Sequence, residues 1–301
     1  MKGWCELNKL PALVQRFIKD NYGEPKMIVE LSGVNKERGA SCLRLLFEKR
    51  SVIVKKTIYK REYDVYNHLT SFFHSKKIYI PNTYYTYEEE KGYWFVIEDI
   101  PLPFPNTRWK GDTEQIKYLF TLHFNTWNQN LNINEPFIFQ WRKNLDNKAL
   151  KLLPLNLKAV IEGLRIVSKD IFAKLCCISG DPNPTNWGIR NNNQLVLFDW
   201  ERIGYGSPAI DLAIIIPGLG TVDKSLETSI ANTYINFWKA TSVSFPYSVS
   251  ELTQQITIAK IWSALDFIVN NADTLEKQTL ELIVKQLSDK LEYEHATLQK
   301  M

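Results

Sequence analysis

The most informative part of the sequence is a pair of neighbouring stretches, SGDPNPTN at residues 179–186 and LVLFDWE at residues 195–201. Asp181 stands in a loop dense in Gly and Pro, directly after an apolar run, and such a loop can hold a carboxylate at the mouth of a cleft. Asn186 supplies a neutral oxygen, and Asp199 supplies an anionic oxygen at the end of an aliphatic strand. The pattern therefore predicts three oxygen-bearing side chains around one site.

These three side chains suit phosphoryl transfer. Mg²⁺ takes oxygen ligands and keeps substrate phosphates in the same coordination shell. Phosphoryl transfer needs one carboxylate near the acceptor hydroxyl and a metal site, because the protein mainly positions groups and neutralises charge. We therefore expect Asp181 to be the catalytic base, and Asn186 and Asp199 to be the ligands of Mg²⁺.

At these residues the chain resembles the aminoglycoside phosphotransferase and choline kinase-like small-molecule kinases, relatives of the protein kinases. Asp181 and Asn186 match their H-G-D-x-x-x-x-N motif, and Asp199 matches their strand that ends in D-W-E or D-F-E. The segment GSPAIDLA at 206–213 resembles their G-D-P-x-x-D-L-A. Ser179 departs from the pattern, since the family places there a His that supports the catalytic loop.

The resemblance implies an α+β fold with two lobes, of the protein-kinase type. The Pro-rich stretch Pro101–Pro105 is the best candidate boundary, because Pro removes backbone donors and stops helices. We expect residues 1–100 to form a small β-rich lobe that binds the nucleotide. Residues 101–301 are expected to form a larger, mainly helical lobe with the catalytic loop and the acceptor site.

Hydrophobic spacing agrees with this division. Apolar residues at three- and four-residue intervals predict a helix over Leu10–Ile18 and another over Lys60–Phe73. Runs rich in β-branched and aromatic residues predict five strands, at 27–31, 42–47, 51–55, 82–87 and 93–97. Beyond the boundary the pattern is mostly helical, and the longest predicted helices span 253–269 and 274–298.

The third predicted strand ends on two lysines, Lys55 and Lys56. By resemblance, Lys55 would contact the α- and β-phosphates of ATP, and Glu62 at the start of the next helix would be its partner. Consecutive strand residues point to opposite faces, so only one of the two lysines can face the cleft. Alternation leaves the choice open, and we favour Lys55 because the family places its lysine directly after the aliphatic run.

Two further segments are assigned to the nucleotide. The loop after the first strand, with Ser32 and Gly33, would cradle phosphates with backbone N–H groups, although it lacks G-x-G-x-x-G and also fits a plain hairpin turn. The segment Glu98–Ile100 resembles the hinge of the family. Main-chain groups of Glu98 and Ile100 would then bond adenine, while the side chain of Glu98 would be structural.

Composition limits the remaining function classes. The 301 residues are 45% hydrophobic and carry a net charge of +4, which favours a globular chain that binds neither nucleic acid nor a membrane. Charged residues within 1–22 interrupt any signal-peptide core, so we expect a cytoplasmic protein. Residues 223–301 contain seven Lys against ten Asp and Glu, which favours a cationic acceptor. His123 is interpreted as a packed helix residue and Asp211 as a helix cap.

The sequence therefore predicts an enzyme that transfers the γ-phosphoryl group of ATP, or of GTP, to a hydroxyl of a small molecule. Aminoglycosides, choline and other amino-alcohols are acceptors that the resemblance suggests. The alternative is a non-catalytic nucleotide-binding module of the same fold, motivated by Ser179. A helical scaffold with coincidental motifs is a third hypothesis. The oligomeric state is not readable from the chain.

Overall fold

The computed structural model describes residues 7, 10–31, 41–221 and 223–298, with side chains up to residue 294. The chain forms two compact units. Unit 1 comprises Met1–Pro103, Asn132–Phe137 and Thr185–Ile203, and unit 2 comprises Phe104–Leu131, Ile138–Pro184 and Gly204–Met301.

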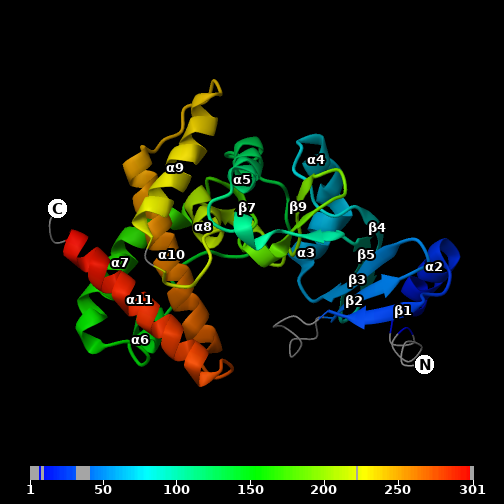
Figure 1. The fold of residues 1–301 in the computed structure, drawn as a ribbon, viewed down its shortest axis with the longest axis horizontal. Helices are drawn as coiled ribbons and strands as arrows, with labels where there is room; N and C mark the ends of the chain where they lie inside the picture. The colour runs from blue at the N-terminus through cyan, green and yellow to red at the C-terminus, as the bar shows by residue number, and fades with distance from the viewer. Residues whose placement is uncertain (1–6, 8–9, 32–40, 222, 299–301) are drawn as a thin grey trace. The chain divides into compact units, whose positions relative to one another are not determined.

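Unit 1 is built on an antiparallel sheet of five strands in the order β1-β2-β3-β5-β4 (Figure 1). The strands are β1 (Met27–Glu30), β2 (Ser41–Leu46), β3 (Ser51–Thr57), β4 (Thr83–Glu89) and β5 (Gly92–Glu98). β3 lies between β2 and β5, and its residues Val52, Ile53 and Val54 are buried. A central strand buried on both faces accounts for its continuous aliphatic run.

One face of the sheet is covered by helix α2 (Ala12–Tyr22). Its Val14 and Ile18 share a core with Val52 and Val54 of β3. Burying each such aliphatic side chain contributes about 1.5–3 kcal/mol. Gly23 ends the helix with φ +78°, a conformation that favours glycine, and its N–H donates to the carbonyl of Lys19.

The other face is covered by a helical segment in three parts. They are α3 (Lys60–Asp64), the π-helical turn η2 (Val65–Leu69) and α4 (Thr70–Ser75). Tyr66 of η2 lies against Phe95 of β5, with the ring centroids 4.5 Å apart. Phe95 is opposite Lys55 in the β3–β5 register, so Lys55 is on the face that carries α3.

A second, three-stranded sheet completes unit 1, in the order β6-β8-β9. Its strands are β6 (Leu102–Pro103), β8 (Trp187–Ile189) and β9 (Leu195–Leu197). It is joined to the rest of the unit by the N–H of Leu197, which donates to the carbonyl of Tyr79. The hairpin of β8 and β9 carries the two informative stretches of the sequence at its ends.

Unit 2 is mainly helical and is organised around α10 (Val249–Asn271), which packs against α8, α9 and α11 (Figure 1). The other α-helices are α5 (Thr113–Asn125), α6 (Leu145–Ala149), α7 (Lys158–Val167), α8 (Pro208–Ile214), α9 (Lys224–Lys239) and α11 (Lys277–Leu298). Strands β7 (Cys176–Ile178) and β10 (Gly204–Gly206) form an antiparallel pair beside them. Short 3₁₀ turns span Asn106–Arg108, Leu155–Leu157, Ser168–Phe172 and Pro184–Asn186.

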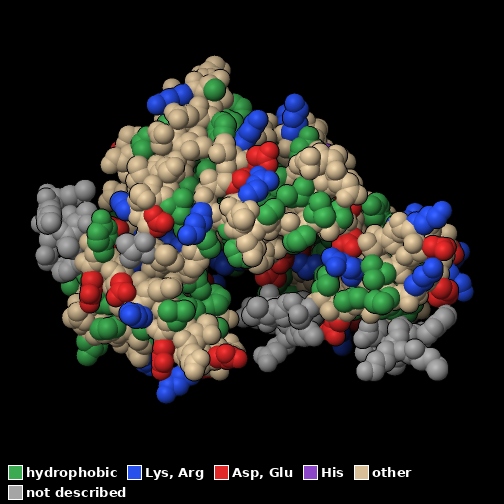
Figure 2. Space-filling view, viewed as in Figure 1, with side chains coloured by type: hydrophobic (Ala, Val, Ile, Leu, Met, Phe, Trp, Pro, Cys, Tyr) green, Lys and Arg blue, Asp and Glu red, His purple; other side chains and the backbone are tan. Residues whose placement is uncertain are grey.

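The α+β fold class predicted from the sequence is confirmed, with the order helix, three strands, helix, two strands in unit 1 and helices dominating unit 2. On the face drawn in Figure 2, Lys and Arg side chains lie among Asp and Glu side chains within each unit. Lys26 pairs with Glu48, and Arg44 with Asp99.

Candidate active site

The centre of the candidate site in unit 1 is Lys55. Its Nζ lies 2.5 Å from Oε1 of Glu62 and 2.7 Å from Oδ1 of Asp199. Glu62 comes from α3 and is fully buried, whereas the side chain of Asp199 keeps 37% of its surface exposed. The structure therefore brings together three of the residues that the sequence singled out, from three separate elements of one unit.

The neighbouring lysine points the other way. Lys56 pairs with Glu89 at 3.0 Å, and its Nζ lies 5.2 Å from the centre of the Trp94 ring. Trp94 belongs to the core beneath α2, on the opposite face of the sheet. Strand alternation could not tell which of the two lysines faces α3. The packing of the helices on the sheet shows that it is Lys55, which pairs with Glu62.

Burial and charge act against each other at these groups. Burial by itself lowers the pKa of Lys55, but the Asp199 and Glu62 carboxylates outweigh it, and the pKa is raised well above its ordinary value. Burial raises the pKa of Glu62, and Lys55 opposes this shift. Lys55 is therefore a permanent cation at neutral pH, as a group that neutralises polyphosphate must be.

Asp199 is held by the residue that follows it. Trp200 is fully buried, stacks on Phe73 with a centroid distance of 5.3 Å, and donates its indole N–H to the carbonyl of Leu197. The backbone of Asp199 itself is left-handed, with φ 65°, a conformation that Asp tolerates better than most residues. The buried ring thus anchors the turn that presents the carboxylate to Lys55.

Asn186 and Asp199 stand at the same end of the β8–β9 hairpin. Asn186 directly precedes β8, Trp187 pairs with Leu197 of β9, and the N–H of Phe198 donates to the carbonyl of Asn186. An amide and a carboxylate oxygen are ligands that Mg²⁺ accepts together with substrate phosphates. The donor set fits Mg²⁺. Among the described residues there is no group of three or more His, Cys, Asp or Glu that could hold a metal ion.

The segment predicted to be the hinge is held by its side chains. Glu98 accepts two hydrogen bonds from Arg190, at 2.8 and 2.5 Å, and a third from the Asn82 side chain. Burial raises the pKa of Glu98, but the hydrogen bonds from Arg190 and Asn82 and the positive charge of Arg190 together outweigh it, so the pKa lies below its usual range. Ile100 is buried against Gly188 of β8. Ser32 and Gly33 lie outside the described residues.

The loop that carries Asp181 belongs to unit 2, where a buried carboxylate supports it. Asp211 of α8 accepts the N–H of Ser179 at 2.9 Å, the N–H of Gly180 at 2.8 Å and the Ser179 hydroxyl at 3.3 Å. Gly180 has φ +78°, which lets the chain turn immediately before Asp181. Asp181 accepts a hydrogen bond from the Asn183 side chain at 3.0 Å.

The interpretation of Asp211 as a helix cap is wrong, because Ser207 caps α8 and the Asp211 side chain supports the loop instead. His123 of α5 extends the same network, with Nε2 3.1 Å from Asp211 and Nδ1 3.0 Å from the Tyr234 hydroxyl. An ionised carboxylate only accepts, so Nε2 of His123 carries the proton. The sequence signal was a His on an otherwise apolar helix face, which we interpreted only as packing.

Asp181 belongs to unit 2, whereas Asn186 and Asp199 belong to unit 1. Their convergence on one ion therefore stays a prediction.

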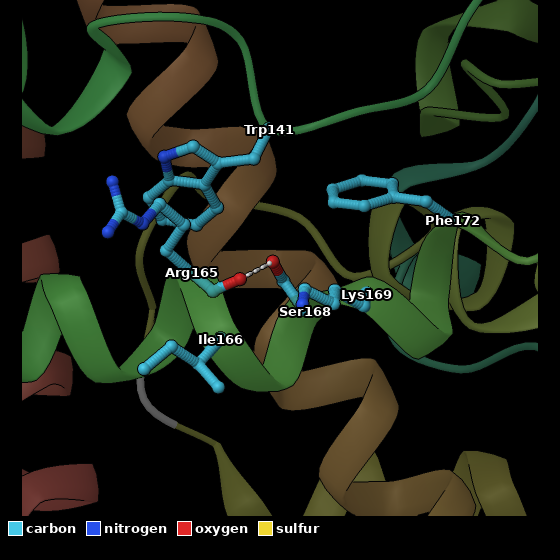
Figure 3. Close-up of a pocket in the computed structure, with 6 residues that line it drawn as sticks. All are labelled: Trp141, Arg165, Ile166, Ser168, Lys169 and Phe172. Carbon is cyan, nitrogen blue, oxygen red and sulfur yellow. Dashed lines mark hydrogen bonds between the residues drawn. The ribbon is translucent and has the colours of Figure 1, made fainter.

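Within unit 2, a separate cavity of about 380 Å³ lies beside α7, and none of the predicted site residues lines it (Figure 3). Its walls include Trp141, Phe172 and Arg165, whose carbonyl accepts the Ser168 hydroxyl at 3.0 Å.

Solved structures of several small-molecule kinases have the same fold. Choline kinase LicA from Streptococcus pneumoniae matches with a TM-score of 0.61 at 17% identity, over 93% of this chain and 96% of that chain. Spectinomycin phosphotransferase, in complex with ADP and spectinomycin, matches with 0.58 at 14% identity, over 97% and 99%. A thermostable mutant aminoglycoside phosphotransferase, in complex with ADP and hygromycin B, matches with 0.57 at 10% identity, over 92% and 97%.

No protein-family model and no curated protein sequence matches the chain. The structural similarity extends over both units, so the chain has the fold of these kinases, and the resemblance seen in its motifs is confirmed at the level of the fold. None of the helices described here has the length and apolar character needed to cross a bilayer.

Proposed function

From this shared fold and the arrangement around Lys55, we propose that the protein is an ATP-dependent phosphotransferase that phosphorylates a hydroxyl of a small molecule. The observation that carries the proposal is the contact of Lys55 with both Glu62 and Asp199. A lysine held between two carboxylates costs desolvation and packs no better than an apolar residue, so a structural role explains it poorly. A cation placed for phosphates explains it directly.

Each group of unit 1 has a role in holding the nucleotide. Lys55 binds the α- and β-phosphates, and Glu62 keeps its ammonium group in place. Backbone groups of Glu98–Ile100 bind adenine. Asn186 and Asp199 would hold Mg²⁺, which neutralises charge on the transferring phosphoryl group. Two structures of this fold were solved with ADP, which supports nucleotide use. Ser32 and Gly33 are proposed to cover the phosphates.

The Asp181 carboxylate is proposed to act on the acceptor. It orients the hydroxyl and takes its proton as the hydroxyl oxygen forms a bond to the γ-phosphorus. The bond from that phosphorus to the β,γ-bridging oxygen breaks, and ADP leaves with the electron pair. The protein forms no covalent bond in this reaction. Its main contribution is to align the hydroxyl with the γ-phosphate. The support of the loop by Asp211 serves this alignment.

The variant Asp181→Asn tests the assignment of the base. Loss of a general base lowers turnover by about 10²–10⁴-fold. We expect the affinity for Mg·ATP, measured by calorimetry, to stay within about threefold of the wild type, because Asp181 makes no contact proposed for the nucleotide. Turnover at the wild-type rate in Asp181→Asn would show that another group is the base.

The acceptor class needs a direct search. Several acidic residues after position 223 have structural roles: Glu227 pairs with the buried Lys290, Asp266 pairs with Arg142, and Glu251 caps α10. The acidic balance is therefore a weaker guide to a cationic acceptor than the sequence suggested. A panel of aminoglycosides, amino-alcohols and neutral polyols, with ATP and GTP as donors and ADP or GDP release as readout, identifies the class.

The alternative function is a non-catalytic nucleotide-binding module, favoured by Ser179 in place of the motif His. A thermal shift with Mg·ATP, without phosphate transfer to any member of the panel and without slow ATP hydrolysis, would support that alternative. Phosphate transfer to any acceptor excludes it. Failure to bind either nucleotide would instead leave the scaffold hypothesis.

A further inference from the structure

The segment Asn132–Phe137 belongs to unit 1, although the residues before and after it in the sequence belong to unit 2. We call it the strap. Two of its residues, Asn132 and Glu135, have left-handed backbones, with φ 54° and 50°. For Glu this conformation is unfavourable, so the surrounding contacts of the strap must offset its cost.

The strap holds helix α3 through a buried carboxylate. Oδ2 of Asp64, a residue only 1% exposed, accepts the backbone N–H of Asn134 at 2.8 Å and the Asn134 side-chain amide at 2.9 Å. Asp64 lies two residues after Glu62 in α3, the first part of the helical segment 60–75. The first turn of a helical segment gains stability from contacts outside it, and the bonds from Asn134 are such contacts.

The strap also holds the turn that follows Asp199. The N–H of Phe137 donates to the carbonyl of Ile203 at 2.8 Å, and the Arg202 guanidinium lies 4.8 Å from the centre of the Phe137 ring. Arg61 of α3 completes the link, because its Nε donates to the carbonyl of Glu201 and its Nη1 donates to the carbonyl of Glu135 at 3.4 Å. One short segment thus joins the elements that carry the two carboxylates around Lys55.

We propose that the strap is a positioning element for the nucleotide site, which sets Glu62 and Asp199 around Lys55 through Asp64, Asn134 and Arg61. Its consequence for nucleotide binding rests on the proposed function. Its effect on Lys55 does not, because the contacts exist in the protein alone. The contacts described above run from the strap to α3 and to the 201–203 turn, so the strap acts through these two elements.

Four variants separate this role from general stability. Asp64→Ala removes the acceptor of both hydrogen bonds, and Asn134→Ala removes one donor and is the milder change. Asp64→Asn keeps an oxygen that can accept both bonds but loses the charge, so its effect should be smaller than that of Asp64→Ala. Asn67→Ala is the matched control: it loses the exposed hydrogen bonds of its side chain with Thr86 and His68, in the same unit and with no partner in the strap.

The first readout is the rate at which acetic anhydride acetylates Lys55 in the nucleotide-free protein, followed by peptide mass spectrometry. An ion-paired, partly buried amine reacts through local opening, so we expect about tenfold faster labelling in Asp64→Ala and about threefold in Asn134→Ala. Lys56, which pairs with Glu89 on the other face, serves as the internal reference. Faster labelling of Lys56 as well would mean general loosening and would overturn the proposal, as would Lys55 rates equal to those of Asn67→Ala.

The second readout is the affinity for Mg·ADP by calorimetry. We expect about tenfold weaker binding in Asp64→Ala, a smaller loss in Asp64→Asn, and an affinity near the wild type in Asn67→Ala. Unchanged affinity in Asp64→Ala overturns the proposal if the wild type binds Mg·ADP. If the wild type binds no nucleotide, the proposed function is refuted. The labelling rate of Lys55 then tests by itself whether the strap positions the groups around Lys55.

Discussion

Replacing Asp211 by Asn probes the support of the loop that carries Asp181 with the smallest possible change in shape. Each carboxylate oxygen of Asp211 accepts one backbone N–H: Oδ1 accepts that of Gly180 and Oδ2 that of Ser179. Asn has one oxygen and one NH₂ group, so either orientation of its amide turns a donor towards a backbone donor. His123 favours the orientation with the NH₂ at the Oδ2 position, because its Nε2 can change tautomer and accept.

The expected loss of stability in Asp211→Asn follows from these contacts. The N–H of Ser179 loses its partner in a fully buried site, and an unsatisfied buried donor costs about 1–3 kcal/mol. The N–H of Gly180 and the Ser179 hydroxyl keep an oxygen acceptor, but they lose its charge, which adds about 1 kcal/mol. We therefore expect Asp211→Asn to lower the free energy of unfolding by about 2–4 kcal/mol. Turnover should fall by roughly tenfold to a hundredfold, because Asp181 directly follows Gly180.

Urea unfolding monitored by circular dichroism, together with steady-state turnover, measures both effects. Asp223→Asn is the matched control in the same unit. Asp223 caps α9 by accepting the N–H of Leu226, and Asn is as good a cap as Asp, so its unfolding free energy should change by less than about 0.5 kcal/mol. If Asp211→Asn is as stable as Asp223→Asn, the reasoning from the two carboxylate oxygens is refuted.

Two other perturbations test unit 1 and unit 2 separately. Gly188→Ala places a Cβ 2.5 Å from Cγ2 of Ile100, so we expect a loss of about 1–3 kcal/mol by urea unfolding. Gly163→Ala, in α7 with nothing within 4 Å of its Cβ, should instead stabilise, and equal midpoints for the two variants would contradict the packing argument. Burial, aided by Lys290, lowers the pKa of Lys260 to about 7, far below the value of about 10.4 in the unfolded chain. The unfolded state therefore binds more protons between these pKa values, and stability should rise with pH from 7 to 9. Lys260→Met should flatten that rise, and an equal rise in the variant would assign it to another group.

Many helices and strands of the fold can be predicted from local patterns in the sequence. The aliphatic runs of β2, β3 and β5 and the helical spacing of α2, α3, α10 and α11 predict these elements, because periodicity reports which face of an element is buried. The motif residues Asp181, Asn186 and Asp199 stand out because loops dense in Gly and Pro, and polar residues at strand ends, are local patterns. Local patterns need no knowledge of distant contacts, and together with the family resemblance of the motifs they led to the fold class.

Contacts between distant residues decided the rest. Alternation along β3 separates Lys55 from Lys56, but only the antiparallel register with Phe95 and the packing of α3 on that face select Lys55. Asp211 looks like a cap in isolation, yet the loop that it supports lies about thirty residues earlier in the chain. The pairing of Asp64 with Asn134 joins residues that are seventy positions apart. A buried carboxylate must be hydrogen-bonded, and its partners are the donors that lie next to it after the unit has folded. The tertiary packing therefore determines these partners, and the residues next to the carboxylate in the sequence do not.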